Sequence, residues 1–264
     1  MKTNFPERII CLTEETTELL YALGEEDRIV GISEFTKRPG IAKETKPVVG
    51  SFIDANYELI EQLKPDLIFT FSDVQANVTK KLIQNGYNVI ANNQHTIREI
   101  FNMMLLVGSI VGKGKEVQKL TAAIEKKMDS IRAKSAKMKA RPKVYFEEWD
   151  DPMIAGNTFV SELIEIAGGD DIFPEMRGKR KAKDRMTVAP EVMMRNPDII
   201  IASWCGEKVG MDSFMKRNDW SSTNAGINQR MFDIDSSVIL QPGIAALTEG
   251  LDQIRIIISN FKEK

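Results

Sequence analysis

The chain has 264 residues, of which 42% are apolar and 28% are charged, and its formal net charge is −2. This length and apolar content suit two small domains, or one large one, with a buried core. The nearly balanced charge excludes the basic excess of a nucleic-acid-binding protein, and the absence of 18 consecutive apolar residues argues against membrane insertion.

The first residues, MKTNFPERIICL, lack the apolar run of a signal peptide, because Pro6, Glu7 and Arg8 interrupt it. From the sequence as written we expect a cytoplasmic protein. The alternative is a periplasmic or extracellular protein whose export signal has been removed.

Strand and helix signals alternate through the N-terminal half. The run Arg8–Leu12 predicts a strand, and Thr13–Leu23 predicts a helix that Gly24 ends. Further strands are predicted at Val30–Ser33, Val48–Gly50 and Leu67–Thr70. This alternation is typical of an α/β lobe with a parallel sheet.

The middle of the chain predicts one long helix. From Lys113 to Met138 the apolar residues follow helical spacing, and no Pro occurs before Pro142. About 25 residues at about 1.5 Å each make a rod of roughly 38 Å. We expect this helix, within residues 113–140, to join an N-terminal lobe (1–112) to a C-terminal lobe (141–264). A coiled-coil arm is the alternative.

A short motif occurs once in each half, as LKPDLIF around Pro65 and as RNPDIII around Pro197. Each copy places a Pro between a helix and a buried strand. The first predicted strands begin at Arg8 and Lys143, 57 and 54 residues before these prolines. The matched spacing predicts two Rossmann-like parallel-sheet lobes with the same plan.

Four segments resemble, in order, the periplasmic receptors for cobalamin, haem and ferric siderophores, and the cobalamin type most. They are PERIICLTEETTELLYALGEEDRIVGIS, VVGSFIDANYELIEQLKPDLIFTF, FVSELIEIAGGDDIF and APEVMMRNPDIII. The resemblance extends from about Pro6 to Phe261. It implies the class III substrate-binding architecture, a ligand in the cleft between two lobes, and a role as the substrate-binding component of an ABC-type uptake system.

The resemblance also implies an ABC permease as partner, with the chain acting as a monomer. Receptors of this family carry one exposed glutamate on each lobe that pairs with the permease. The corresponding positions here are Ala76 or Asn77 and Val238 or Ile239. The chain therefore lacks those docking glutamates at the expected places.

Ligands of open α/β sheets bind beyond the carboxyl ends of the strands. The residues that follow the predicted strands are therefore the candidate ligand-binding residues. In the N-terminal lobe they are Glu14, Glu15, Phe35, Arg38, Phe52, Asp54, Phe71 and Ser72. In the C-terminal lobe they are Glu148, Trp149, Asp150, Trp204, Cys205 and Gln241, with Glu148–Asp150 expected in a loop after a strand at Val144–Phe146.

The chemistry of these candidates favours a corrinoid. Aromatic groups suit the flat face of a macrocycle. Crowded carboxylates raise one another's pKa unless a cation or a donor-rich ligand is present, and the amides of a corrinoid supply donors that an anionic ferric siderophore lacks. Each candidate also has a plainer alternative. Glu14 or Glu15 only stabilises the N-terminus of its helix through the helix dipole, and the acidic stretch 147–150 and the basic stretch 177–185 are solvated loops. Cys205 is a small buried hydrophobe or a reactive thiolate.

We therefore expect non-catalytic binding of a cobalamin-like ligand, without an intrinsic cofactor. His95 is the only histidine, and no nucleophile–base pair is evident, so no enzyme is predicted. Two alternatives remain open. One is a cytoplasmic protein of this fold that binds a metal, a polar cation or a nucleoside-like molecule, including as an enzyme. The other is a ferric-siderophore or haem receptor.

Overall fold

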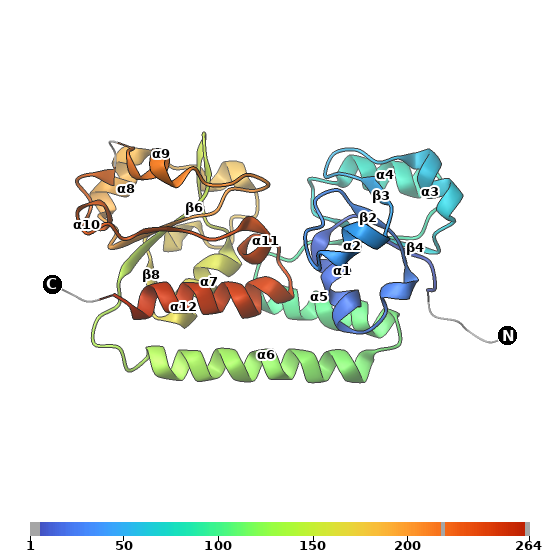
Figure 1. Ribbon diagram of the computed structural model, residues 1–264, viewed down its shortest axis with the longest axis horizontal. Helices are drawn as coiled ribbons and strands as arrows, with labels where there is room; N and C mark the ends of the chain where they lie inside the picture. Colours follow the sequence, from blue (N-terminus) through green and yellow to red (C-terminus); the bar gives the residue numbers. More distant parts are fainter. Residues whose placement is uncertain (1–5, 218–219, 262–264) are drawn as a thin grey trace. The chain divides into compact units, whose positions relative to one another are not determined.

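The computed structural model describes residues 6–217 and 220–261, which form two compact units (Figure 1). Unit 1 contains the residues up to Gln94 together with Arg98–Ala123. Unit 2 contains His95–Ile97 and the residues from Ile124 onward. The predicted long helix is a single helix, α6 (Gly114–Ser135), of 22 residues, and it contributes to both units.

Unit 1 is built on a five-stranded parallel sheet with the order β3-β2-β1-β4-β5. Its strands are β1 (Ile9–Cys11), β2 (Ile29–Ser33), β3 (Val48–Gly50), β4 (Leu67–Phe71) and β5 (Val89–Asn92). Its helices are α1 (Glu14–Ala22), α2 (Ile41–Thr45), α3 (Tyr57–Leu63) and α4 (Ala76–Gln84); α5 (Ile97–Ile110) begins at the border of the two units. The central strands are buried on both faces, as their continuous apolar sequence predicts.

Unit 2 has a sheet with the order β10-β9-β6-β7, and β8 pairs with the start of β6. Its strands are β6 (Lys143–Asp150), β7 (Met153–Ala155), β8 (Asp170–Asp171), β9 (Ile199–Ala202) and β10 (Met231–Asp233). The helices are α7 (Thr158–Ala167), α8 (Ala189–Arg195), α9 (Met211–Met215), α10 (Asn224–Ile227), α11 (Ser236–Ile239) and α12 (Leu251–Ser259). A π-helical turn, Ala246–Gly250, leads into α12, and short 3-10 turns cover Glu26–Arg28, Pro174–Met176 and Ala182–Arg185.

The β6–β7 pair is antiparallel, whereas the other pairings of this sheet are parallel. The two strands form a hairpin around Asp151 and Pro152, which are joined by a cis peptide bond. The predicted α/β class with two parallel-sheet lobes is confirmed, with this hairpin as a local addition in unit 2.

The repeated Pro-Asp motif has the same structural role in both units. Lys64 and Asn196 end α3 and α8 in the left-handed conformation, with φ of 47° and 49°, directly before each proline. The Asp66 carboxylate then accepts hydrogen bonds from the backbone N–H groups of Glu7 and Arg8 at 2.7 and 3.1 Å. The Asp198 carboxylate accepts one from the N–H of Lys143 at 2.9 Å. In each unit the motif thus fixes the start of the central strand.

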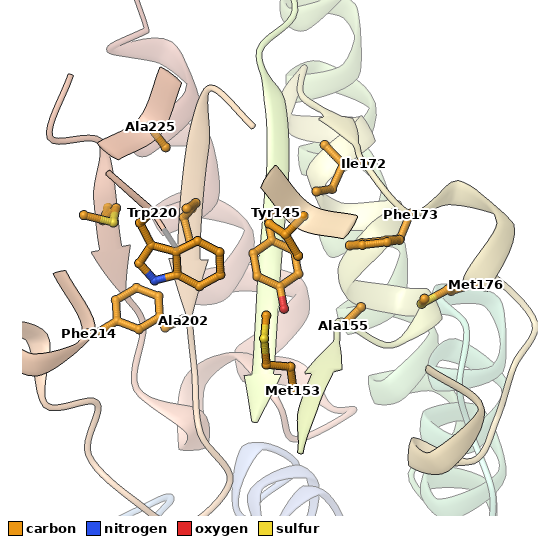
Figure 2. Packing of buried hydrophobic residues seen from close by; sticks show 13 residues of the cluster. Tyr145, Met153, Ala155, Ile172, Phe173, Met176, Ala202, Phe214, Trp220 and Ala225 are labelled. Carbon is orange, nitrogen blue, oxygen red and sulfur yellow. The ribbon is translucent and has the colours of Figure 1, made fainter. Parts of the chain in front are cut away.

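Aromatic residues fill one side of the core of unit 2 (Figure 2). Tyr145 and Trp220 lie with ring centroids 5.9 Å apart, and Phe214 lies 6.0 Å from Trp220. All three side chains are fully buried or nearly so. This cluster matters for the site because it lies beneath the loop that follows β9.

Among the helices that the structure describes, none has both the length and the apolar composition that a membrane crossing requires.

Candidate functional site

The loops after β1, β2 and β3 of unit 1 leave the same edge of the sheet, because these strands are parallel neighbours. The loop after β2 carries Phe35, and the loop after β3 carries Phe52. Their rings stack with centroids 4.3 Å apart and an interplanar angle of 8°. Both side chains are half-buried. The two candidate phenylalanines therefore form one flat aromatic platform.

Gln75 holds three of these loops together. Its Nε2 donates to the backbone oxygens of Leu12 and Ser51, each at 3.0 Å, and its Oε1 accepts from the N–H of Phe71 at 2.9 Å. The side chain is fully buried. Its amide therefore connects the loops that follow β1, β3 and β4, where a ligand of this fold binds.

Glu14 and Glu15 occupy the first turn of α1, directly after β1, and both are buried. Burial raises the pKa of Glu14 to about 8 and that of Glu15 to about 7. Glu15 accepts a hydrogen bond from Gln94 Nε2 at 3.3 Å. The sequence analysis expected neighbouring carboxylates to raise these pKa values, whereas burial is the larger cause and the neighbouring glutamates add less.

The other candidates of unit 1 occupy the same edge in different ways. Arg38 forms an ion pair with Glu18 at 3.1 Å. Asp54 is exposed, and its Oδ1 accepts from the N–H of Ala55. Phe71 ends β4 half-buried, and Ser72 follows it with a φ of 52°. The structure therefore brings the candidates of unit 1 to one edge of its sheet.

The predicted loop at Glu148, Trp149 and Asp150 is wrong, because β6 continues to Asp150 and all three residues belong to the β6–β7 hairpin. Apolar periodicity ends at Phe146, so no local signal indicates that antiparallel pairing extends the strand. The Trp149 indole N–H donates to the Asp151 backbone oxygen at 3.0 Å, which fixes this ring at the hairpin.

Arginines inside unit 2 already compensate its carboxylates. Arg185 is buried and donates to both carboxylate oxygens of Glu148 at 2.7 and 3.0 Å. Arg217 Nη1 donates to Glu147 Oε1 at 2.8 Å. The interpretation of 147–150 and 177–185 as solvated loops is therefore wrong for Glu147, Glu148 and Arg185, and Glu148 does not need a cationic ligand.

Trp204 and Cys205 follow β9, as predicted. Trp204 is partly buried and meets Phe214 edge to face, with centroids 6.1 Å apart. Cys205 is exposed, so it is not a small buried hydrophobe. Gln241 is half-buried but follows α11 rather than the strand β10, because a short helix intervenes between them.

Arg217 was not among the candidate residues of the sequence analysis, because only the fold brings it to the Glu147 carboxylate. Gln75 follows a predicted strand, as a ligand-binding candidate would, but its amide is used by backbone groups. Of the positions considered for a docking glutamate, Ala76 and Asn77 are exposed, but Val238 and Ile239 are buried in α11.

Within residues 6–217 and 220–261, no three His, Cys, Asp or Glu side chains are grouped so that they could hold a metal ion.

Comparison with known proteins gives one family and several relatives. The periplasmic binding protein family model matches residues 9–238. An uncharacterised ABC transporter substrate-binding lipoprotein of Bacillus subtilis is 27% identical over 271 residues, covering 98% of this chain and 82% of that protein. A vitamin B12-binding protein of Yersinia pestis is 28% identical over 203 residues, covering 75% of this chain and 69% of that protein.

Solved structures share the fold over nearly the whole chain. A Staphylococcus epidermidis protein, described as a possible iron-binding, periplasmic solute-binding protein, matches with a TM-score of 0.81 at 25% identity. The match covers 97% of this chain and 99% of that chain. The relatives are thus named for different ligands.

The expected cytoplasmic location is corrected by these matches. The matching family model is that of periplasmic proteins, and the relative from Bacillus subtilis is a lipoprotein. Both point to a location outside the cytoplasm. The cytoplasmic location expected from the first twelve residues is therefore wrong.

Proposed function

Because the chain belongs to the periplasmic binding protein family, we propose that it is the non-catalytic substrate-binding component of an ABC uptake system and that its ligand is a corrinoid of the cobalamin type. The proposed partner is the permease of that system. Docking then uses residues other than Ala76, Asn77, Val238 and Ile239, none of which carries a carboxylate.

The stacked pair Phe35 and Phe52 is the observation that carries the choice of ligand. Two rings stacked 4.3 Å apart and nearly parallel cover one face of each other and leave an outer, flat apolar ring face at this edge of the sheet. A planar macrocycle covers such a surface, whereas a small polar cation gains little from it. Phe71, at the end of β4 on the other side of β1, extends the apolar character of this edge.

Charge supports a corrinoid over an anionic iron chelate. Glu14, Glu15 and Asp54 lie at this edge, and the nearby Arg38 is already paired with Glu18. A catecholate siderophore would add negative charge beside Asp54 and would disfavour the ionised forms of Glu14 and Glu15, whose pKa values burial already raises to about 8 and about 7. Similarity to a vitamin B12-binding protein supports a corrinoid as the ligand, and similarity to a possible iron-binding protein supports an iron compound as the alternative.

Visible-absorbance titration tests the proposal. We expect saturable binding of cyanocobalamin and hydroxocobalamin at micromolar or lower concentration, and weaker binding of haemin and of a ferric catecholate. Saturable binding of haemin or the ferric chelate without binding of either cobalamin would instead assign the chain to the haem and siderophore receptors.

Variants locate the binding surface. Replacing Phe52 by Ala should weaken cyanocobalamin binding about tenfold, because roughly 1–3 kcal/mol of ring contact is lost. The control is Phe101→Ala, which removes a half-buried ring from α5 in the same unit. Equal affinities of the two variants would remove the aromatic platform from the site.

A further inference from the structure

Unit 1 buries two polar groups that its own atoms leave without well-formed hydrogen bonds. The Glu14 side chain is 3% exposed, and its carboxyl oxygens accept no well-formed hydrogen bond from the described residues; only the backbone N–H of Lys37 interacts weakly with them. Thr36 is 0% exposed, and its hydroxyl has no partner among the described residues. Buried polar groups are nearly always hydrogen-bonded, so two such groups in one region require a cause.

The two groups belong to adjacent loops. Glu14 follows β1, and Thr36 follows β2, its parallel neighbour. The backbone N–H of Lys37, the residue after Thr36, makes a weak hydrogen bond to the Glu14 carboxyl group that lowers its pKa, although burial raises that pKa more. The Glu14 carboxyl group therefore lies against the loop that carries Phe35 and Thr36.

Helix capping does not explain Glu14. A carboxylate at a helix N-terminus is stabilising when it accepts N–H groups of the first turn, and Glu14 accepts none. The hydroxyls of Thr16 and Thr17 instead donate to the Thr13 backbone oxygen. Glu15 and Glu18 lie near enough to make ionisation of Glu14 harder still. The fold gains nothing evident from this side chain.

We propose that Glu14 and Thr36 form a subsite of unit 1 that binds a primary carboxamide of the ligand. This inference rests on the proposed function and names the chemical group, a side-chain amide, by which unit 1 recognises the donor-rich part of the ligand. The carboxyl group accepts the amide N–H, and the Thr36 hydroxyl is free to bond to the amide carbonyl. A carboxyl group that keeps its proton offers one donor and one acceptor, which is also the complement of a carboxamide.

The ligand test compares cyanocobalamin with dicyanocobyrinic acid, in which carboxylic acids replace the side-chain amides. Replacing Glu14 by Leu should weaken cyanocobalamin binding about tenfold, because the hydrogen bond from the ligand amide to the carboxyl group is lost. Glu14→Gln should retain affinity within about threefold, because it keeps a donor and an acceptor. The control Glu58→Leu removes an exposed first-turn glutamate of α3 and should change nothing.

If the wild type binds cyanocobalamin and the Glu14→Leu variant binds it equally tightly, the subsite is overturned and the proposed function is left intact. The same holds if Glu14→Leu loses affinity equally for the amide and the acid form, since its effect is then not specific for amides.

A second measurement decides the subsite even if no corrinoid binds. Propionamide, the side-chain fragment alone, is titrated at high concentration into the full chain and followed by NMR. We expect saturable shifts at Glu14 and Thr36 in the wild type that disappear in Glu14→Leu. Their absence from the wild type would overturn the subsite, whereas their presence without corrinoid binding would keep the subsite and reject only the corrinoid.

Discussion

Arg217 donates to Glu147 at 2.8 Å, and its guanidinium group lies over the Trp220 ring, 4.6 Å from the centroid. Glu147 is fully buried in β6 and also accepts from the Tyr145 hydroxyl at 3.4 Å. One arginine thus connects the loop that follows α9 to the central strand and to the aromatic core of unit 2.

Removing this arginine should be costly. Arg217→Met leaves the Glu147 carboxylate buried without its cation, and breaking a buried pair typically costs about 3–5 kcal/mol. Urea unfolding should show a large loss of stability for this variant and a smaller one for the double variant Glu147→Gln, Arg217→Met. The control Arg255→Met removes a partly exposed arginine 3.8 Å from Asp252 and should change stability by under about 1 kcal/mol. Equal effects at Arg217 and Arg255 would contradict a structural role for the buried pair.

Gln75 offers a second test. Gln75→Leu leaves the oxygens of Leu12 and Ser51 and the N–H of Phe71 without their present partner, and each buried unpaired group costs about 1–3 kcal/mol. Hydrogen exchange should become faster at the Phe71 amide, and ligand affinity should fall because the loops lose their connection. Gln84→Leu, at the end of α4, is the matched control. Unchanged exchange at Phe71 would show that the side chain does not hold β4 to its neighbours.

Stability should fall between about pH 5 and pH 8. Burial raises the pKa of Glu14 from 4.5 to about 8 and that of Glu15 from 4.5 to about 7, and the pKa of Glu147 also rises to about 7. The folded chain then holds more protons than the unfolded chain in this range, so unfolding becomes easier as pH rises. Urea unfolding of Glu14→Gln at pH 5 and pH 8 should show a smaller decline than the wild type shows. A wild-type stability that increases across this range would contradict the assignment.

Trp204 should contribute to ligand binding. Its ring is partly buried, meets Phe214 edge to face, and follows β9 at the edge where ligands of this fold bind. Trp204→Ala should weaken binding of cyanocobalamin by about 1–3 kcal/mol if the indole covers an apolar part of the ligand. Trp149→Ala provides the comparison, because that indole is held at the hairpin by the Asp151 oxygen. Unchanged affinity of a folded Trp204→Ala protein would remove this residue from the site.

Local sequence signals determined the central strands of unit 1, the first helix and the long helix α6. Helix ends such as Gly24 and Gly168 have the left-handed φ values, 69° and 100°, that glycine permits. The two Pro-Asp motifs marked equivalent strands, β4 and β9, because the same left-handed turn and the same carboxylate contacts recur in each unit. Residues that directly follow strands, including Phe35, Phe52 and Trp204, could therefore be assigned to the ligand-binding edge from order alone.

Contacts between residues far apart in the sequence were decided only by the tertiary structure. Arg185 reaches Glu148 and Arg217 reaches Glu147 across 37 and 70 residues, so an apparently unpaired acidic stretch is compensated inside the fold. Gln75 reaches Leu12 across 63 residues and is used by the backbone rather than left for a ligand. In unit 1 the sequence determined which side chains come to the edge of the sheet, because strand order and chain direction suffice for that, whereas in unit 2 the β6–β7 hairpin and α11 altered the expected positions. Whether each polar group there is already paired depends on distances of a few ångströms between distant segments, and only the packed chain sets those distances.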